Sequence, residues 1–397
     1  MSRRYLERVL LGEERGAISW LIRGIAWPFS LAYRTGLAAF FGTYTLGVRK
    51  KHRLGVPVLS VGNLTFGGTG KTPAVEAITR MLVGQGRRVA ILSRGHGGAA
   101  SGPLVVSDGN SITASASECG DEPAALARAL PGVPIVVGKD RRASGDLACR
   151  QFRPDVILLD DGLQYWQLHR DLDIVVMDAL RPFGSGFVMP MGDLREPRTG
   201  LRRARVILLN GARDLESNRV EKLEAEISRL APGALILRCA RRPRGLVGPG
   251  GTELPPEWLR GRRVLAFCGI GRPDSFFEIL KSLGADVCER LPFPDHYRYT
   301  TTDLALIGSR REVLEAEAIV TTEKDRVRLD ELSGSAGEYG PEEIEAGDSR
   351  VVCRSVLDQL YVLGVELEIE EQFRLAELIA SVLDGTSQAS ATGQEAD

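Results

Sequence analysis

The feature that most constrains this chain is a glycine-rich loop between a strand pattern and a helical pattern. The strand is predicted at Val58–Val61, and apolar residues at helical spacing begin at Val75. The order strand, loop, helix is the context in which a phosphate-binding P-loop forms. Backbone N–H groups of such a loop, with the positive end of the following helix, close around a phosphate. The residues predicted to bind the nucleotide are Thr65, Phe66, Gly67, Gly68, Thr69, Gly70, Lys71 and Thr72.

Two side chains at the end of this loop carry chemistry. Lys71 is predicted to reach the β- and γ-phosphates, and the Thr72 hydroxyl is predicted to bind Mg²⁺. The usual pattern G-x-x-x-x-G-K-[ST] has glycine where this chain has Thr65. The alternative is a chance turn between a strand and a helix. Because every surrounding element fits, the loop indicates that the chain binds a nucleoside triphosphate.

Composition excludes some other classes of protein. With 397 residues the chain has room for two domains. Its 51 basic residues balance 52 acidic ones, which argues against a general nucleic-acid binder. The six cysteines are scattered and lack metal-ligand spacing, so they are interpreted as reduced residues of a cytoplasmic protein.

The N-terminal residues differ from the rest in charge and hydropathy. Residues 1–56 carry ten Arg or Lys against three Glu, and they are rich in apolar and aromatic residues. Arg23 and Arg34 interrupt the apolar run, which argues against a membrane-spanning helix and against a secretory signal.

This segment is therefore predicted to form two amphipathic helices that lie on a membrane surface. Trp20, Trp27 and Phe29 would enter the headgroup boundary, and the basic run at 49–53 would attract anionic lipid. The alternative is a helical hairpin that packs on its own domain with its charges solvated.

Downstream of the loop, strands and helices alternate as they do in a parallel α/β sheet. Residues 241–251, rich in Pro, Gly and Arg, are interpreted as a connection to a second α/β unit. Gly269-Ile-Gly271 lacks the rest of a dinucleotide fingerprint and is interpreted as a strand-to-helix turn. The predicted strands are Val89–Ser93, Pro134–Val137, Val156–Asp160, Ile174–Met177, Val206–Leu209, Arg263–Gly269 and Ala318–Thr321; the predicted helices are Glu122–Leu130, Arg141–Phe152 and Ser275–Leu283.

The predicted fold is thus a P-loop NTPase-type parallel sheet domain with a second, smaller α/β lobe and an N-terminal membrane-surface helical segment. Residues 333–349 are predicted to form an acidic, glycine-rich loop. The predicted divisions are 1–55 for the membrane-associating segment, 56–240 for the P-loop core, 241–384 for the second lobe and 385–397 for a disordered tail.

Further candidate site residues follow predicted strands or begin helices. An apolar strand ends in Asp160 and Asp161, the form of a Walker B strand, although a plain Asp-Asp-Gly turn is the alternative. Asp121 stands at a helix start, where a cap is the simpler interpretation. Arg94 begins a glycine-rich turn suited to a phosphate or sugar contact. His296 follows an acid that can fix the tautomer of its imidazole.

Together these segments resemble one family, the tetraacyldisaccharide 4′-kinases of lipid A biosynthesis. The resemblance runs from about residue 15 to about residue 330. Its markers are Val61-Gly-Asn-Leu-Thr-Phe-Gly-Gly-Thr-Gly-Lys-Thr-Pro73, Ser93-Arg-Gly-His-Gly-Gly98, Gly120-Asp-Glu-Pro123, Asp160-Asp-Gly-Leu-Gln164, Arg170-Asp-Leu-Asp-Ile-Val-Val176, Gly192-Asp-Leu-Arg-Glu196, Asp295-His296 and Thr321-Thr-Glu-Lys-Asp325. Thr65 fits this resemblance, because the family's loop is similar to T-x-G-G-x-G-K-T.

The resemblance implies transfer of the γ-phosphate of ATP, with Mg²⁺, to the 4′-hydroxyl of a tetraacylated glucosamine disaccharide 1-phosphate, giving lipid IVA. It implies a lipid substrate and a place on the cytoplasmic face of the bacterial inner membrane. Asp121 would be the base for the sugar hydroxyl, supported by His296 from the other lobe. Asp160 and Asp161 would be the Walker B acids and Glu196 a second metal contact. Arg94 and Gln164 would contact the substrate.

The chain departs from the family pattern at a few positions. His96 and Tyr165 stand where the family usually has Tyr and His, and Ser185 stands where it usually has Asn. Met189-Pro-Met-Gly-Asp193 replaces L-P-A-G-P. These changes leave the phosphate-binding residues intact but concern contacts to sugar or acyl chains, so the sequence does not predict an acyl-chain preference.

The sequence leaves three alternative functions. A GTPase-type switch would need a guanine-reading N-K-x-D motif, and Asn210-Gly-Ala-Arg and Thr322-Glu-Lys-Asp325 match it only in part. A metallochaperone would need paired Cys or His ligands. A non-catalytic membrane scaffold would leave the P-loop and the Asp160-Asp161 pair without a role.

Overall fold

The computed structural model describes residues 5, 8–9, 12, 14, 16–334 and 355–392. Its contacts divide the chain into two compact units. Unit 1 comprises Met1–Arg94, Val133–Ala240 and Leu367–Asp397, and unit 2 comprises Gly95–Gly132 and Arg241–Glu366. This division differs from the consecutive one expected from sequence, which placed residues 95–132 in the P-loop core and residues 367–384 in the second lobe.

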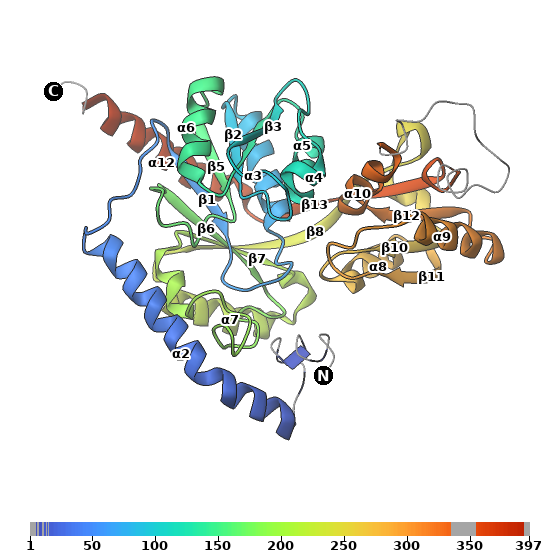
Figure 1. Ribbon diagram of the computed structural model, residues 1–397, viewed down its shortest axis with the longest axis horizontal. Helices are drawn as coiled ribbons and strands as arrows, with labels where there is room; N and C mark the ends of the chain where they lie inside the picture. The colour runs from blue at the N-terminus through green and yellow to red at the C-terminus, as the bar shows by residue number, and fades with distance from the viewer. Residues whose placement is uncertain are drawn as a thin grey trace. The chain divides into compact units, whose positions relative to one another are not determined.

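Unit 1 is built on a parallel sheet with the strand order β8-β7-β6-β1-β5-β2-β4 (Figure 1). Runs of Val, Ile and Leu fill its central strands and are buried on both faces, as parallel strands between helices require. The predicted α/β class is confirmed. The strands are β1 (Val58–Gly62), β2 (Val89–Ser93), β4 (Pro134–Val137), β5 (Val156–Asp160), β6 (Leu172–Asp178), β7 (Val206–Asn210) and β8 (Leu235–Val247).

Helices pack against this sheet. Helix α3 (Lys71–Gly84) packs on β1, β2 and β5, and α6 (Arg141–Phe152) packs on β2 and β4. Helix α7 (Ser217–Leu230) lies near β7, toward the other end of the strand order (Figure 1). Helix α7 buries Val220, Leu223 and Ile227 in a cluster with side chains of β6 and β7. Two 3₁₀ turns, η1 (Arg198–Arg203) and η2 (Ala212–Asp214), and the C-terminal α12 (Gln372–Thr392) complete unit 1.

The register of this sheet places the candidate phosphate site. Val61 of β1 lies beside Asp160 of β5. The two strands are parallel, so the loop after β1 and the acids after β5 emerge at the same edge. Open α/β sheets bind ligands at this carboxyl edge, where the strand order reverses.

Unit 2 has its own parallel strands in the order β11-β10-β12-β13. Gly269-Ile-Gly271 lies in the turn between β10 and α8, as predicted. The strands are β3 (Leu104–Asp108), β9 (Glu253–Leu254), β10 (Arg263–Cys268), β11 (Asp286–Pro292), β12 (Ala318–Thr322) and β13 (Leu360–Ile369). The helices are α4 (Ala116–Cys119), α5 (Asp121–Ala129), α8 (Pro273–Ser282), α9 (Thr301–Val313) and α10 (Glu323–Gly334), with short 3₁₀ turns η3 (Pro249–Gly251) and η4 (Pro256–Leu259).

The predicted loose connection at 241–251 is wrong over most of its length. Strand β8 continues to Val247, and Leu246 and Val247 pair with Leu254 and Glu253 of β9. Pro243 and Gly245 disfavour a strand locally. The neighbours of β8 in the sheet, β7 and β13, lie far from it in sequence and override that preference.

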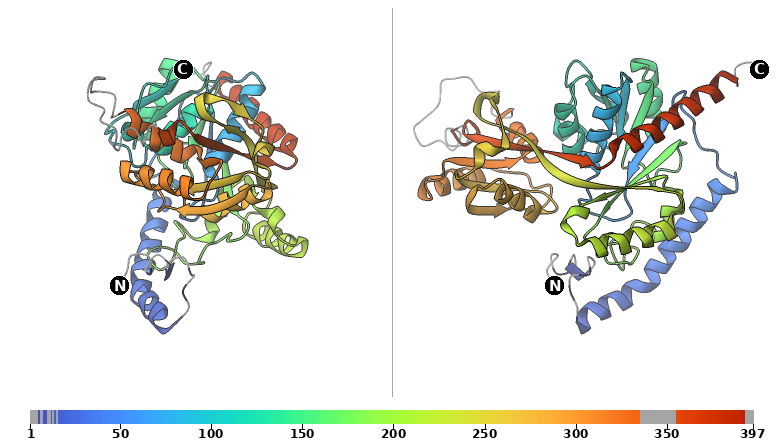
Figure 2. Two further views of the ribbon diagram at one scale, coloured as in Figure 1. Left: turned by 90° about the vertical axis from the view of Figure 1, so that its right-hand side faces the viewer. Right: turned by 180° about the vertical axis from the view of Figure 1, so that it is seen from behind.

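Between residues 16 and 48, where two amphipathic helices were predicted, the structure has one helix. Helix α2 (Ala17–Thr45) is continuous through Pro28 (Figure 2). The Ser30 hydroxyl donates to the carbonyl of Val188 at 2.7 Å, and the Tyr33 hydroxyl donates to that of Arg195 at 3.0 Å. These two hydrogen bonds hold α2 to the rest of unit 1, just after Pro28. Among the described residues, no helix is both long enough and apolar enough to cross a membrane.

Two other predictions concern the ends of described segments. Helix α12 extends to Thr392 and so enters the range 385–397, for which no order was expected, while residues 393–397 lie outside the described residues. The loop predicted at 333–349 lies outside the described residues from residue 335 onward.

Candidate active site

The glycine-rich loop has the backbone conformation that phosphate binding requires. Gly67 and Gly70 adopt φ angles of 101° and 100°, a region that other residues rarely occupy. Helix α3 begins directly after Gly70, at Lys71. The Cβ of a residue at position 67 or 68 would meet no heavy atom within 4 Å, so the loop surrounds open space. The loop can thus approach a phosphate closely with its backbone.

Two asparagines outside the predicted site brace this loop. The Asn63 amide donates to the carbonyl of Thr65 at 2.8 Å and to the hydroxyl of Thr69 at 3.0 Å. Its oxygen accepts from the Lys71 ammonium at 3.2 Å. Asn210, at the end of β7, donates to the carbonyl of Thr69 at 2.9 Å. The loop is therefore held in shape before any ligand arrives.

The acids that follow β5 have different environments. Asp160 is buried and accepts a hydrogen bond from the Ser93 hydroxyl at 3.0 Å. Asp161 adopts a left-handed φ of 52°, and both its oxygens accept from Nη1 of Arg195 at 2.7 Å. The Lys71 ammonium lies 3.8 Å from Asp161. The structure thus brings Lys71 and Asp161 together, as a Walker A lysine and a Walker B acid require.

The charges around Asp161 keep its carboxylate ionised. Burial alone raises the pKa of Asp161, but the positive charges of Lys71 and Arg195 outweigh it and lower the pKa. An ionised carboxylate 3.8 Å from Lys71, the first residue of α3, suits Mg²⁺, which binds one or two carboxylates together with substrate phosphates. The residues present therefore fit a magnesium–nucleotide complex.

Glu196 does not have the surroundings of a metal contact. Its side chain is 1% exposed and pairs with the Arg203 guanidinium. It also accepts a hydrogen bond from the amide of Gln164 at 2.7 Å, while the same amide nitrogen donates to the carbonyl of Asn63 at 3.0 Å. Glu196 therefore acts as a buried counterion that ties the loop before α3 to η1. Gln164 is predicted to contact substrate, but its amide nitrogen already donates hydrogen bonds to Asn63 and Glu196 within unit 1.

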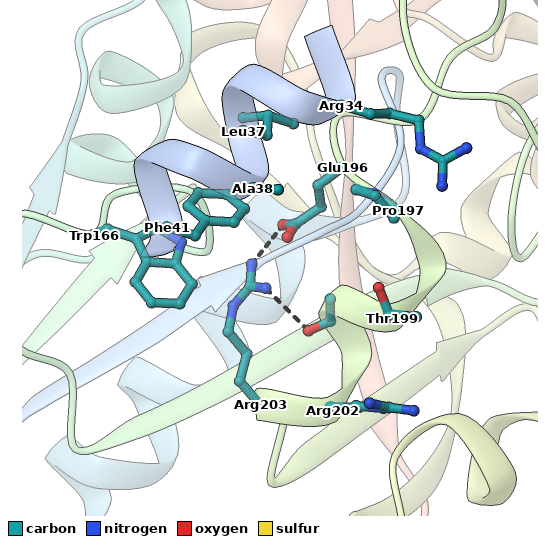
Figure 3. A pocket seen from close by; sticks show the side chains of 11 residues that line it. Arg34, Leu37, Ala38, Phe41, Trp166, Glu196, Pro197, Thr199, Arg202 and Arg203 are labelled. Atoms are coloured by element: carbon teal, nitrogen blue, oxygen red, sulfur yellow. Dashed lines mark hydrogen bonds and ion pairs between the residues drawn. The ribbon is translucent and has the colours of Figure 1, made fainter. Parts of the chain in front are cut away.

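The Glu196–Arg203 ion pair forms part of the wall of a cavity of about 300 Å³, which residues of α2 also line. Figure 3 shows the Arg203 guanidinium between Glu196 and the ring of Trp166, with Phe41 of α2 nearby. Phe41 stacks on Trp166 with the ring centroids 4.6 Å apart. The cavity is thus mixed in character, with aromatic and arginine side chains side by side.

Replacing Glu196 with glutamine should destabilise the protein by about 3 kcal/mol, because breaking a buried pair leaves the Arg203 charge uncompensated. Urea unfolding measures the change. Glu226→Gln is the matched control, since Glu226 pairs with Arg198 at the surface and should contribute less than about 1 kcal/mol. Unchanged stability of Glu196→Gln, together with a higher Mg²⁺ concentration needed for half-maximal activity, would instead support the predicted metal contact.

In unit 2, a carboxylate and an imidazole from distant parts of the sequence meet. Asp121 is the first residue of α5, and His296 follows β11 with a left-handed φ of 57°. Nδ1 of His296 lies 3.1 Å from Oδ2 of Asp121. The predicted pair is present, but both residues belong to unit 2, so His296 does not come from the other compact unit as expected.

The glycine-rich turn after β2 packs against the residue that precedes Asp121. A Cβ on Gly120 would lie 2.4 Å from the carbonyl oxygen of His96, and a Cβ on Gly98 would lie 2.4 Å from that of Glu118. Only glycine allows this approach of two backbones. The turn therefore supports the start of α5. Arg94, at the beginning of the turn, is exposed, and its role as a substrate contact stays a prediction.

Electrostatics couple Asp121 and His296. Burial raises the pKa of Asp121, but a hydrogen bond with His296 and the nearby Arg328 guanidinium outweigh burial and lower the pKa to about 2. The hydrogen bond with Asp121 raises the pKa of His296 against the effect of its partial burial. Asp121 is thus ionised at neutral pH, and the His296 imidazole is in hydrogen-bond contact with it.

Two departures from the family pattern contact each other. The backbone N–H and the hydroxyl of Ser185 both donate to Oδ1 of Asp193 at 2.7 Å. The carbonyl of Asp193 accepts from the N–H of Phe66 at 2.8 Å. The two changed residues therefore form one unit that supports the phosphate loop.

The third departure, Tyr165, also makes local contacts. Its hydroxyl donates to Asp140 at 3.0 Å, and the Arg141 guanidinium lies 4.4 Å from the ring centroid. Tyr165 therefore stabilises the N-terminal end of α6.

Comparison with known proteins gives consistent matches. A family model described as "LpxK: Tetraacyldisaccharide-1-P 4'-kinase" matches residues 22–383. The protein named "Tetraacyldisaccharide 4'-kinase" of Syntrophus aciditrophicus is 43% identical over 310 residues, which cover 76% of this chain and 83% of that protein. The protein of the same name from Anaeromyxobacter sp. (strain K) is 41% identical over 332 residues, covering 83% of this chain and 88% of that protein.

A solved structure agrees with these matches. The crystal structure of the "apo" form of LpxK from Aquifex aeolicus in complex with ATP has a TM-score of 0.69 and 31% sequence identity. The similarity covers 91% of this chain and 99% of that chain. The two proteins therefore share the fold along nearly their whole length.

Proposed function

Because the chain belongs to the tetraacyldisaccharide 4′-kinase family, we propose that it transfers the γ-phosphate of ATP to the 4′-hydroxyl of a tetraacyldisaccharide 1-phosphate, giving lipid IVA in lipid A biosynthesis. The observation that carries this proposal is the family match over residues 22–383 on a chain whose Lys71 and Asp161 lie together beside a glycine-rich loop. Phosphoryl transfer asks mainly for positioning and charge stabilisation, which these residues supply.

The residues of unit 1 have distinct roles in this proposal. The backbone of the loop and Lys71 hold the nucleotide phosphates, and Lys71 stabilises the charge that develops on the transferring group. Thr72 and Asp161 would hold the Mg²⁺, which would neutralise phosphate charge when bound. Asp160, buried under Ser93, orients the acidic end of β5. Arg94 and Gln164 are kept as proposed substrate contacts, Gln164 through its oxygen, because its amide nitrogen bonds Asn63 and Glu196.

In unit 2, Asp121 accepts the proton of the attacking hydroxyl in this proposal. A carboxylate with a pKa of about 2 is ionised at working pH, so it can accept a hydrogen bond from the hydroxyl. Its low pKa makes it a weak base, so it would take the proton only as the hydroxyl oxygen bonds to phosphorus. His296 contacts the same carboxylate. A hydrogen bond donated by its ring N–H would stabilise the ionised form of Asp121 and hold it in place. No covalent intermediate on the protein is needed for this transfer.

Dependence on acceptor and nucleotide tests the reaction class. The purified protein should release ADP from ATP only when the disaccharide 1-phosphate lipid is present in detergent micelles, and GTP should replace ATP poorly. A GTPase-type switch would instead hydrolyse GTP without lipid. Turnover of GTP that is independent of the lipid would overturn the proposed kinase activity.

We further propose that α2 attaches the protein to a membrane surface, at the cytoplasmic face of the bacterial inner membrane. The two buried side chains of α2 are Ser19 and Ser30. Arg34 and Thr35 are exposed on α2, but seven of its exposed side chains are large and apolar, the reverse of an ordinary surface helix. They are Ile18, Trp20, Leu21, Ile25, Trp27, Phe29 and Leu31. The exposed basic residues Arg49, Lys50 and Arg53 follow the helix and would attract anionic lipid.

Vesicle binding tests this attachment. Replacing Trp20 and Trp27 with serine should lower co-sedimentation with anionic vesicles at least tenfold, because two exposed indole rings no longer enter the headgroup boundary. High salt should release part of the intact protein, since each basic residue near the surface contributes about 1 kcal/mol. The control replaces Leu306 and Val313, exposed apolar residues of α9, with serine and should bind normally. Equal loss in both variants, or no binding by the intact protein, would contradict membrane attachment through α2.

A further inference from the structure

Arg328 lies under the Asp121–His296 pair, although no motif of the sequence marks it. It is on α10, which packs against α4 and α5 in unit 2. Its side chain is 4% exposed. An arginine is almost never this buried unless its charge is paired, so its partners explain its presence.

The guanidinium of Arg328 donates hydrogen bonds to three groups and lies close to His296. Nε donates to Oδ2 of Asp121 at 2.7 Å. Nη1 donates to the carbonyl of Gly269 at 2.8 Å and to Oδ1 of Asp325 at 3.0 Å. Nη2 lies 3.4 Å from Nδ1 of His296. One rigid group thus touches both members of the candidate catalytic pair.

Asp325 fixes the other side of this guanidinium. It is fully buried and accepts hydrogen bonds from the Tyr299 hydroxyl at 2.9 Å, the Thr322 hydroxyl at 2.6 Å and the N–H of Gly269 at 3.0 Å. With so many donors, its carboxylate cannot turn without losing bonds. The position of the guanidinium is therefore set by the core of unit 2 and not by Asp121 alone.

We propose that Arg328 is a positioning residue that holds the Asp121 carboxylate in one orientation against His296. This inference rests on the proposed role of Asp121 as the base. The planar guanidinium carries donors in a fixed fork, so it can orient a carboxylate in a way that the single ammonium of lysine cannot. Oδ2 of Asp121 takes the bonds from Arg328 and His296, which leaves Oδ1 as the oxygen that faces a substrate hydroxyl.

The charges around His296 make this arrangement measurable. Asp121 and Glu122 of α5, Asp295 of the preceding loop and Arg328 of α10 face the imidazole. Glu122 is paired with Lys324 at 2.6 Å, and Asp325 is paired with Arg328. Arg328 is the group among those facing His296 that lowers the pKa of the imidazole, while the three carboxylates raise it. Loss of the guanidinium charge should therefore make His296 hold its proton to higher pH.

A histidine titration by NMR tests the proposal on the full chain without ATP or lipid. The chain has four histidines, so the imidazole signals can be assigned by single replacements. In Arg328→Gln, the midpoint of the His296 titration should rise, and kcat should fall at least tenfold with KM little changed. Arg326→Gln is the control, because Arg326 lies on the same helix and pairs with Asp330 away from His296.

Arg328→Lys separates charge from orientation. It keeps a positive charge, so the His296 midpoint should stay near that of the unchanged protein. It lacks the fork, so kcat should still fall several-fold, and this result decides the question if Arg328→Gln does not fold. Full kcat in folded Arg328→Lys, or an unmoved His296 midpoint in folded Arg328→Gln, would overturn the proposal.

The NMR result is independent of the kinase assignment. An intact protein that transfers no phosphate to the lipid would overturn the proposed function, whereas the His296 titration would still report whether Arg328 controls the pair.

Discussion

Replacing Lys71 with alanine should lower kcat about a thousandfold or more while the protein stays folded. The Lys71 ammonium lies 3.8 Å from Asp161 at the end of the phosphate loop. It is the group that would stabilise the charge on the transferring phosphoryl group. Folding should survive because Asp161 keeps its two bonds from Arg195. The measurement is ADP release with saturating lipid, read together with a urea unfolding curve.

Lys222→Ala is the matched control for this prediction, since Lys222 is exposed on α7. Its activity should be unchanged. A folded Lys71→Ala protein that keeps near-normal turnover would remove the phosphate loop from the mechanism, and with it the kinase assignment.

Asp121→Ala should lower kcat by about two to four orders of magnitude, the usual range for a general base. His296→Ala should cost less, because the imidazole supports the carboxylate that accepts the proton. The double variant should be little worse than Asp121→Ala, since residues that act as a unit are not additive. Steady-state kinetics of the three variants at one pH measure this.

Losses in kcat that multiply in the double variant would contradict the idea that Asp121 and His296 act as a unit. If the double variant loses the product of the two single factors, His296 serves another part of the reaction despite its contact with Asp121 at 3.1 Å. The Asp121→Asn variant supplies a further check, because the midpoint of the His296 titration should fall once the carboxylate charge that raises its pKa is gone.

The parts of the fold that the sequence predicts are those with strong local signals. Strand β1, the glycine-rich loop and α3 follow one another within a short stretch, and β5 is a continuous apolar run that ends in acids. Elements whose stability comes from distant segments have no such signal. Strand β8 survives Pro243 because β7 and β13 lie beside it in the sheet. Helix α2 continues past Pro28, where Ser30 and Tyr33 bond to Val188 and Arg195 elsewhere in unit 1.

The candidate site divides in the same way. Lys71, Thr72 and Asp161 lie in recognisable motifs, and Asn63 is adjacent to the loop that it braces. Arg328 has no such signal, because it is 207 residues from Asp121 and becomes relevant only when α10 packs on α5. Glu196 was assigned to metal binding from its motif, and no local pattern predicts that Arg203 and Gln164 enclose it.

The most direct measurement of the central claim is the position of the phosphate in the product. The protein would be incubated with purified tetraacyldisaccharide 1-phosphate, ATP and Mg²⁺ in detergent micelles, and the lipid analysed by mass spectrometry and ³¹P NMR. We predict a product with a second phosphate monoester at the 4′ position, absent with Lys71→Ala. ADP formation with no phosphorylated lipid, or a phosphate at another hydroxyl, would contradict the account.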